Sequence, residues 1–108
     1  MKVSTRTLKT VNMVLKELKT AREKFSTWPT DPMHSLGVLN EEVGELNKAV
    51  LQAVYDASEY DHHRASDLLQ SVEDEAVQVA AMAIRFIENL NKYQYVRSDM
   101  HIDEEVAR

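Results

Sequence analysis

The 108-residue sequence contains no cysteine, only two glycines and only two prolines. Without cysteine there is no disulfide framework, no thiolate metal site and no cysteine nucleophile. So few glycines and prolines exclude a loop-rich β fold, which needs turn residues at intervals of about eight to twelve positions. No apolar run approaches the roughly 20 residues that span a bilayer. The N-terminus also lacks the apolar stretch of a signal peptide, so we expect a cytoplasmic protein without a membrane partner.

The charged residues give a formal net charge of −5. Nucleic-acid binding requires a basic surface that neutralises phosphates, so this balance argues against a nucleic-acid partner. An acidic protein is better suited to holding cations. The length suffices for one domain with a modest core, and we expect a single domain over residues 1–108. Its core is expected over residues 4–92, with residues 93–108 as a C-terminal tail.

Apolar residues recur at helical spacing in three segments. The first helix is expected over residues 4–25, with Ser4 or Thr5 as its N-cap, and the second over residues 33–57. A third is expected over residues 66–90. The apolar stripe of the first helix is Leu8, Val11, Leu15, Leu18 and Phe25, and that of the second is Leu36, Leu39, Val43, Leu46, Val50 and Ala53.

The segments between these helices are polar. The stretch STWPTDP at residues 26–32 holds both prolines and ends the first helix. The predicted fold is all-α, an antiparallel bundle of three long helices plus a possible short fourth from the tail. Because one chain supplies only three strong helices, we expect oligomerisation to complete the bundle.

The second helix gathers three glutamates, Glu41, Glu42 and Glu45, in the stretch LNEEVGELNKAVL. Like charges at spacings of three and four residues destabilise a helix by a few tenths of a kcal/mol per pair. In the third helix, Glu75 falls within the apolar stripe, beside Val79. Burying an unpaired, ionised carboxylate in that position would destabilise the fold by on the order of several kcal/mol. It therefore needs a basic partner, a raised pKa or a metal ion.

Carboxylates on two antiparallel helices would form a pocket rich in oxygen, extended by the amide of Gln78 one turn after Glu75. Mg²⁺ prefers oxygen ligands and commonly links carboxylates to substrate phosphates, and Mn²⁺ is a possible substitute. The pattern therefore favours a magnesium site. A solvated acidic face with one Glu–Arg pair is the alternative.

Two further features invite a ligand role. Trp28, the only tryptophan, either covers one end of the core or offers a flat surface to a planar ligand. The pair His62 and His63 has metal-binding side chains, but adjacent residues on an extended chain point to opposite sides and no third ligand is near. A metal site at this pair is therefore disfavoured.

The acidic motifs resemble those of the MazG-like all-α nucleoside triphosphate pyrophosphohydrolases. That family carries E-E-x-x-E followed, after a spacer, by E-x-x-D. Here the first motif is matched by Glu41, Glu42 and Glu45, and the glutamate of the second by Glu75, whereas Gln78 stands at the family aspartate. The spacer is on the long side. The resemblance covers roughly residues 25–92 and includes the stretches WPTDPMHSLGVLNEEVGELNKAVLQ and VQVAAMAIRF.

The resemblance implies a Mg²⁺-dependent enzyme that cleaves nucleoside or deoxynucleoside triphosphates to the monophosphate and pyrophosphate, for nucleotide-pool cleansing or control. It implies a homodimer or homotetramer with sites completed between subunits. Glu41 would hold a metal or accept a proton from the attacking water. The metal ligands would be Glu42, Glu45 and Glu75, with Gln78 as a weak ligand, and the substrate-binding residues would be Trp28, His34, Lys48 and Arg85.

Alternatives remain open at several of these positions. The neutral oxygen of Gln78 binds Mg²⁺ less tightly than a carboxylate, which leaves room for a catalytically weakened nucleotide-binding or regulatory protein. A plain helical interaction module with solvated acidic faces is a third possibility. Lys48 fits a solvated position, His34 a cap or surface position, and Arg85 an ion pair with Asp74 or Glu88.

Overall fold

The computed structural model describes residues 2–56 and 62–95, and within this part of the chain all regular structure is helical. Three long α-helices follow one another, α1 (Thr5–Lys24), α2 (Pro32–Tyr55) and α3 (His62–Glu88). A single 3-10 turn, η1 (Leu90–Lys92), follows α3. The prediction of an all-α fold with three long helices is confirmed.

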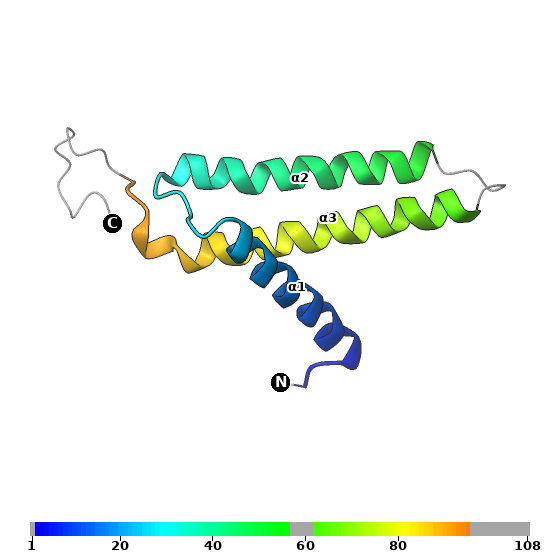
Figure 1. Cartoon of the computed structure of the whole chain (residues 1–108), viewed down its shortest axis with the longest axis horizontal. Coiled ribbons are helices and arrows are strands. Elements are labelled where there is room, and N and C mark those ends of the chain that lie inside the picture. Colours follow the sequence, from blue (N-terminus) through cyan, green and yellow to red (C-terminus); the bar gives the residue numbers. More distant parts are fainter. Residues whose placement is uncertain (1, 57–61, 96–108) are drawn as a thin grey trace.

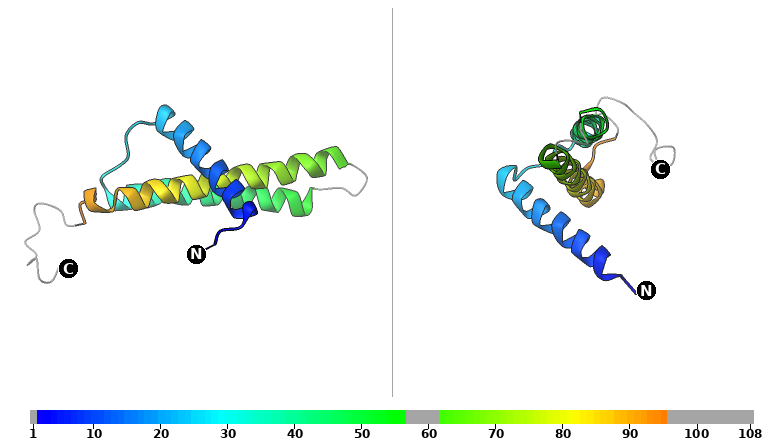
Figure 2. Two further views of the ribbon diagram at one scale, coloured as in Figure 1. Left: turned by 90° about the horizontal axis from the view of Figure 1, so that it is seen from below. Right: turned by 90° about the vertical axis from the view of Figure 1, so that its right-hand side faces the viewer.

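The helices form an antiparallel hairpin with one oblique helix packed against it (Figure 1). Helices α2 and α3 run side by side in opposite directions, and their contact is the most extensive in the molecule. Helix α1 packs against α3, and its N-terminal half diverges from the hairpin, as Figure 1 and the right view of Figure 2 show. The core therefore lies where the C-terminal half of α1 meets α3.

Side-chain caps fix where α1 and α2 begin. The Ser4 hydroxyl accepts a hydrogen bond from the backbone N–H of Thr7, at 3.1 Å, as predicted for an N-cap. The Asp31 carboxylate accepts from the N–H of Met33, at 2.9 Å. Pro32 follows as the first helical residue, where a missing N–H costs nothing. The same Asp and Pro that end the loop therefore start α2.

The buried face of α2 is rotated relative to the predicted apolar stripe. Ser35 and Ala49 are buried, and Glu42, seven residues from each, lies between them on the same face. Val43 and Val50 of the predicted stripe are instead exposed. Glu42 is not part of the predicted stripe. The structure nevertheless buries its Oε2 and brings it near the charge of Glu75 on α3.

The predicted stripe of α1 was largely wrong as a core face. The helix buries Leu18 together with Val14 and Ala21. The remaining predicted core residues are exposed, and they are Leu8, Val11, Leu15 and Phe25. The reason is the oblique packing of α1, because only the row of side chains facing α3 near its C-terminal half is covered within one chain. An apolar row on α1 is left without a partner in the described chain.

The 3-10 turn η1 precedes the predicted tail, and residues 93–95, the described part of that tail, contain no helix. The possible short fourth helix otherwise falls in residues 96–108, outside the described residues. The side chains of His62 and His63 also lie outside the described part. None of the described helices is both long and apolar enough to cross a membrane.

Candidate functional site

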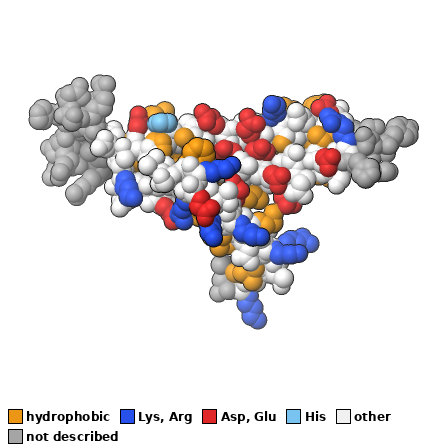
Figure 3. All heavy atoms as spheres, in the orientation of Figure 1, with side chains coloured by type: hydrophobic (Ala, Val, Ile, Leu, Met, Phe, Trp, Pro, Cys, Tyr) orange, Lys and Arg blue, Asp and Glu red, His pale blue; other side chains and the backbone are white. Residues whose placement is uncertain are grey.

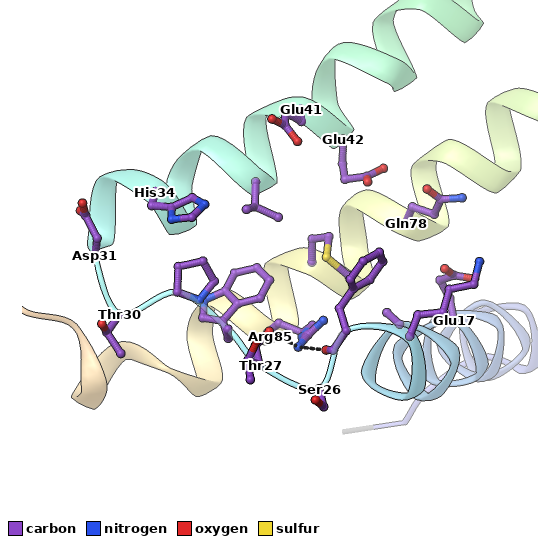
Figure 4. A pocket seen from close by; sticks show the side chains of 17 residues that line it. Glu17, Ser26, Thr27, Thr30, Asp31, His34, Glu41, Glu42, Gln78 and Arg85 are labelled. Carbon is purple, nitrogen blue, oxygen red and sulfur yellow. Dashed lines mark hydrogen bonds between the residues drawn. The ribbon is translucent and has the colours of Figure 1, made fainter.

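A cavity of about 990 Å³ opens where α1, the loop after it, α2 and α3 meet (Figure 4). One end is acidic, with Glu42 of α2 and Gln78 of α3 on the side of Glu17 from α1. Trp28 also lines the cavity and packs against the core. The apolar side chains in the lining are Ala21, Phe25, Trp28, Pro29, Val38 and Met82. The cavity therefore combines an apolar wall with a carboxylate-rich end.

Hydrogen bonds hold the loop that forms one wall, which we term the Trp28 loop (residues 25–31). The Arg85 guanidinium donates to the backbone carbonyls of Phe25, at 2.7 Å, and Thr27, at 3.3 Å. The fully buried Ser35 hydroxyl donates to the carbonyl of Pro29, at 2.8 Å. Because its carbonyls are bonded from both α2 and α3, this loop is a fixed wall of the cavity.

Two carboxylates on facing helices have buried oxygens without partners. The Oε2 atoms of Glu42 and Glu75 are both inaccessible to solvent, and neither has a hydrogen-bond partner within the described residues. A buried, unpartnered acceptor costs about 1–3 kcal/mol, and more when it is charged. A proton, a cation or an ordered water can supply the missing interaction, and a cation also offsets the repulsion between the two carboxylates. The sequence-based expectation that Glu75 lies off the polar face is confirmed.

The surroundings of Glu42 are unfavourable to its negative charge. Burial raises the pKa of the Glu42 carboxyl above its ordinary value, and the nearby negative charge of Glu75 raises this pKa further. Glu45, Glu17 and Glu41 add to the same effect. Four carboxylates around one buried carboxyl therefore create a site that favours a proton or a cation.

Arg85 is buried, with 5% of its surface exposed, and lies over the ring of Trp28, 4.9 Å from the ring centroid. Burial lowers the pKa of its guanidinium, as does the charge of Arg22, whereas Glu88 opposes both. The ion pair of Glu88 is made with Arg22, so the predicted Arg85–Glu88 pair is replaced by bonds to the loop carbonyls. Arg85 therefore holds the Trp28 loop in place from α3, through its hydrogen bonds to the loop carbonyls.

The structure brings most of the predicted site residues to this cavity, and others lie outside its lining. Glu75 is one turn from Gln78 and close enough to Glu42 for their charges to interact. Glu45 and Lys48 are exposed, and neither lines the cavity. The predicted residues in the lining are Trp28, His34, Glu41, Glu42, Gln78 and Arg85.

No group of three or more His, Cys, Asp or Glu side chains in residues 2–56 and 62–95 converges on one point in the way a ready-made metal site would. The paired, unpartnered oxygens of Glu42 and Glu75 nevertheless fit a divalent cation, since they are hard oxygen donors without another partner. With only two such carboxylates and the amide of Gln78, remaining coordination positions would be left for water and phosphate.

Three charged residues in the lining were not predicted to belong to the site, namely Glu17, Lys24 and Asp31, the last of which caps α2. Glu17 lines the acidic end, and Lys24 lies near the Trp28 loop. The signal for Glu17 was its spacing, because it lies three residues after Val14 and four before Ala21, beside the true buried row of α1.

The charges of the described residues are unevenly distributed over the surface (Figure 3). Acidic side chains gather over the hairpin of α2 and α3, whereas lysines and arginines are concentrated along α1. A polyanionic ligand in the cavity would therefore approach from the side of α1 and Lys24, and a cation from the side of the hairpin.

No model of a known protein family matches the chain, and no curated protein or solved structure is significantly similar to it. The resemblance to the MazG-like enzymes consequently depends on the motif residues themselves.

Proposed function

We propose that the protein is a Mg²⁺-dependent nucleoside triphosphate pyrophosphohydrolase that converts nucleoside or deoxynucleoside triphosphates to monophosphates and pyrophosphate. The observation that carries the proposal is the pair of buried carboxylate oxygens on Glu42 and Glu75, which have no hydrogen-bond partner among the described residues, with Glu42 lining a cavity of about 990 Å³. A structural carboxylate pair would be expected to have donors. Two carboxylates without donors, next to a cavity large enough for a ligand, are suited to binding a cation that also contacts a phosphate of the substrate.

Glu42 and Glu75 would hold the Mg²⁺, with the amide oxygen of Gln78 as a weaker or water-mediated ligand. When bound, Mg²⁺ would neutralise charge on phosphoryl oxygens and lower the pKa of a coordinated water. Glu45 is exposed beside this pair and would reach the ion only at its outer side. Glu17 adds negative charge from α1, which favours retention of the cation.

Glu41 is exposed and lines the same cavity one position before Glu42. In the proposed reaction it accepts a proton from the water that attacks the α-phosphorus, with pyrophosphate as the leaving group. Because Glu41 is exposed, the proton can then pass to solvent. Phosphoryl transfer depends mainly on positioning and electrostatic stabilisation, so one correctly placed base is sufficient.

The apolar end of the cavity is the proposed place for the nucleobase, with Trp28 as a stacking surface and His34 at its border. The phosphates would then extend toward Glu42, past Lys24, whose ammonium is available to them on the exposed side of α1. Arg85 contributes a positive charge behind Trp28. Its guanidinium already donates to two loop carbonyls, so its direct role toward phosphate is smaller than that of Lys24. Lys48, outside this lining, would reach the substrate only in an oligomer.

We propose further that the active form is a homodimer or homotetramer in the cytoplasm. The support is the exposed apolar row of α1, formed by Leu8, Val11 and Leu15, each with more than two fifths of its surface exposed. Contiguous exposed apolar area of this kind usually belongs to an interface. A second chain covering α1 would also bring its own charged residues toward the open side of the cavity.

Binding of nucleotide without turnover is a second candidate function, favoured by the neutral Gln78 in the cavity wall. It predicts that nucleotide and Mg²⁺ stabilise the protein although no product forms. A plain helical interaction module, the third candidate, predicts no effect of either ligand on thermal stability.

The deciding experiment is incubation of the purified protein with each common ribo- and deoxyribonucleoside triphosphate, with Mg²⁺ and then with a chelator, followed by chromatography of the products. Metal-dependent monophosphate and pyrophosphate are expected. Glu42→Gln and Glu75→Gln should abolish them, because each removes one cation ligand with little change in shape. Glu73→Gln is the matched control, since Glu73 is an exposed carboxylate on the same helix as Glu75.

The other outcomes have distinct meanings. Diphosphate and free phosphate would show cleavage of the wrong bond and refute the proposed reaction. Product formation that persists in Glu42→Gln would refute the assigned site. Stabilisation by nucleotide without any product would establish the binding protein instead.

A further inference from the structure

The segment after α3 returns to the Trp28 loop and is bonded to it. Tyr93 is buried, with 8% of its surface exposed, although it lies in extended chain beyond the last helical turn. Its hydroxyl accepts a hydrogen bond from the indole N–H of Trp28, at 2.8 Å, and donates to the backbone carbonyl of Phe86, at 2.9 Å. One residue on, the N–H of Gln94 donates to the carbonyl of Thr30, at 3.1 Å. Residues 93 and 94 are thus hydrogen-bonded to the Trp28 loop, which forms the wall of the cavity.

The Tyr93 hydroxyl is suited to this position because it uses both of its hydrogen-bonding functions. Trp28 offers only a donor and the Phe86 carbonyl only an acceptor, and one hydroxyl satisfies both at once. The Tyr93 ring packs against the ring of Phe86, with centroids 5.1 Å apart, which fixes where the hydroxyl lies. The anchor point is therefore α3 itself, through Phe86.

Trp28 is consequently held from two directions. Arg85 lies over its ring, and Tyr93 fixes the edge that carries the N–H. Because the guanidinium occupies one face of the indole, a planar ligand in the cavity would stack on the other face. The orientation of that face depends on the Tyr93 hydroxyl, which prevents rotation of the ring about its side-chain bonds.

We propose that Tyr93 is a positioning residue for ligand binding, and that its hydroxyl sets the orientation of Trp28 as the base-stacking wall of the cavity. This inference depends on the proposed function for the identity of the ligand, a nucleoside triphosphate. The chemical step takes place at the carboxylate end, away from Trp28. Loss of the hydroxyl therefore weakens binding and leaves the turnover of bound substrate unchanged.

The test compares Tyr93→Phe with the matched control Tyr95→Phe. Tyr95 contacts the Tyr93 ring edge-on, with centroids 6.1 Å apart, but is 66% exposed. Because Trp28 is the only tryptophan, its fluorescence reports on this position alone. Tyr93→Phe should alter the emission maximum and make Trp28 more accessible to acrylamide, whereas Tyr95→Phe should do neither.

The same variants are then assayed with Mg²⁺ and the triphosphate that the wild-type protein hydrolyses fastest. Tyr93→Phe should raise KM about threefold to tenfold with kcat unchanged, because the ring must now be immobilised on binding. Unchanged Trp28 emission together with an unchanged KM would overturn the inference. A fall in kcat at constant KM would also overturn it, since it would assign the hydroxyl to the chemical step.

Failure of the proposed function gives a different result. If the wild-type protein forms no product, the affinity of each variant for Mg²⁺ and a triphosphate is measured by the change in Trp28 emission. Weaker binding by Tyr93→Phe than by Tyr95→Phe would then support the positioning role and refute only the enzyme activity. Equal binding by the two variants, or no binding by the wild-type protein, would overturn the positioning role.

Discussion

Replacement of Glu42 by glutamine is expected to stabilise the protein in the absence of divalent ions. Whenever Glu42 of the wild-type protein is ionised, its buried Oε2 has no donor among the described residues and lies close to the charge of Glu75. A glutamine keeps the shape, removes the repulsion and presents an N–H donor to the neighbouring carboxylate. Since an unsatisfied buried acceptor costs about 1–3 kcal/mol, we expect the free energy of unfolding at pH 7 to rise by about 1–2 kcal/mol. For a domain of this size each 1 kcal/mol raises Tm by roughly 4–8 °C.

The stabilisation should depend on pH with a defined sign. Burial and the nearby negative charge of Glu75 raise the pKa of Glu42 in the folded state above its ordinary value of 4.5, so the folded protein binds more protons than the unfolded chain between 4.5 and the raised value. The free energy of unfolding of the wild-type protein therefore falls as the pH rises through this window. The advantage of Glu42→Gln should be full above the window and should shrink as the pH approaches 4.5.

Added Mg²⁺ should reverse the order of stability. A ligand at about 100 times its dissociation constant adds roughly 2.7 kcal/mol to the state that binds it. The wild-type protein should gain this stability, whereas Glu42→Gln, which lacks one ligand, should gain much less. Glu73→Gln makes the same change of net charge at an exposed position and should follow the wild-type protein in both conditions.

The assay is thermal and denaturant unfolding followed by circular dichroism, from pH 4.5 to 8, with Mg²⁺ or with a chelator. Destabilisation of Glu42→Gln at pH 7 in the chelator would refute the reasoning, because it would mean that the carboxylate has a satisfactory partner. An equal response of both proteins to Mg²⁺ would show that Glu42 is not a metal ligand.

Three further predictions follow from individual contacts. Gln78→Asp adds a charged ligand beside Glu42 and should tighten Mg²⁺ binding roughly 10–100-fold. The Mg²⁺ dependence of Tm measures this affinity, and an unchanged dependence would place residue 78 outside the metal site. Arg85→Lys loses the planar guanidinium that donates to the Phe25 and Thr27 carbonyls, so the free energy of unfolding should fall by about 1–3 kcal/mol. Lys92→Arg, at an exposed position, is the control. Full stability of Arg85→Lys would contradict a structural role for Arg85. Leu8→Glu combined with Leu15→Glu should lower the molecular mass in sedimentation without loss of helicity, because both side chains are exposed in the single chain; an unchanged oligomer would exclude this row of α1 as the interface.

The helices were predictable because their signals are local. Ser4 caps α1 as expected, and the Pro-containing loop separates α1 from α2 within one or two residues of the predicted bounds. Both features depend on hydrogen bonds and backbone restrictions between near neighbours in sequence, which is information that a single chain carries without its fold. The inward position of Glu75 was predictable for the same reason, since helical periodicity places it among apolar neighbours.

The faces of α1 and α2 that are buried could not be read from periodicity alone. On α1 the apolar row of Leu8, Val11 and Leu15 is more hydrophobic than the row that is buried, and it remains exposed. Which row is covered depends on the crossing of α1 over α3, a property of two helices together. The contribution of Glu17 to the acidic site depended on this crossing and was missed.

The sequence by itself determined the number, type and approximate limits of the helices, and it indicated Glu41, Glu42, Glu45 and Glu75 as the acidic residues of a candidate site. Only the tertiary structure singled out Glu42 and Glu75, whose Oε2 atoms are buried and have no hydrogen-bond partner within the described residues. It also decided that Arg85 and Tyr93, 57 and 65 residues away from Trp28 in sequence, hold that side chain at the wall of the cavity. The physical reason is that burial and hydrogen bonding between distant residues arise only when α3 and the segment after it pack against the Trp28 loop.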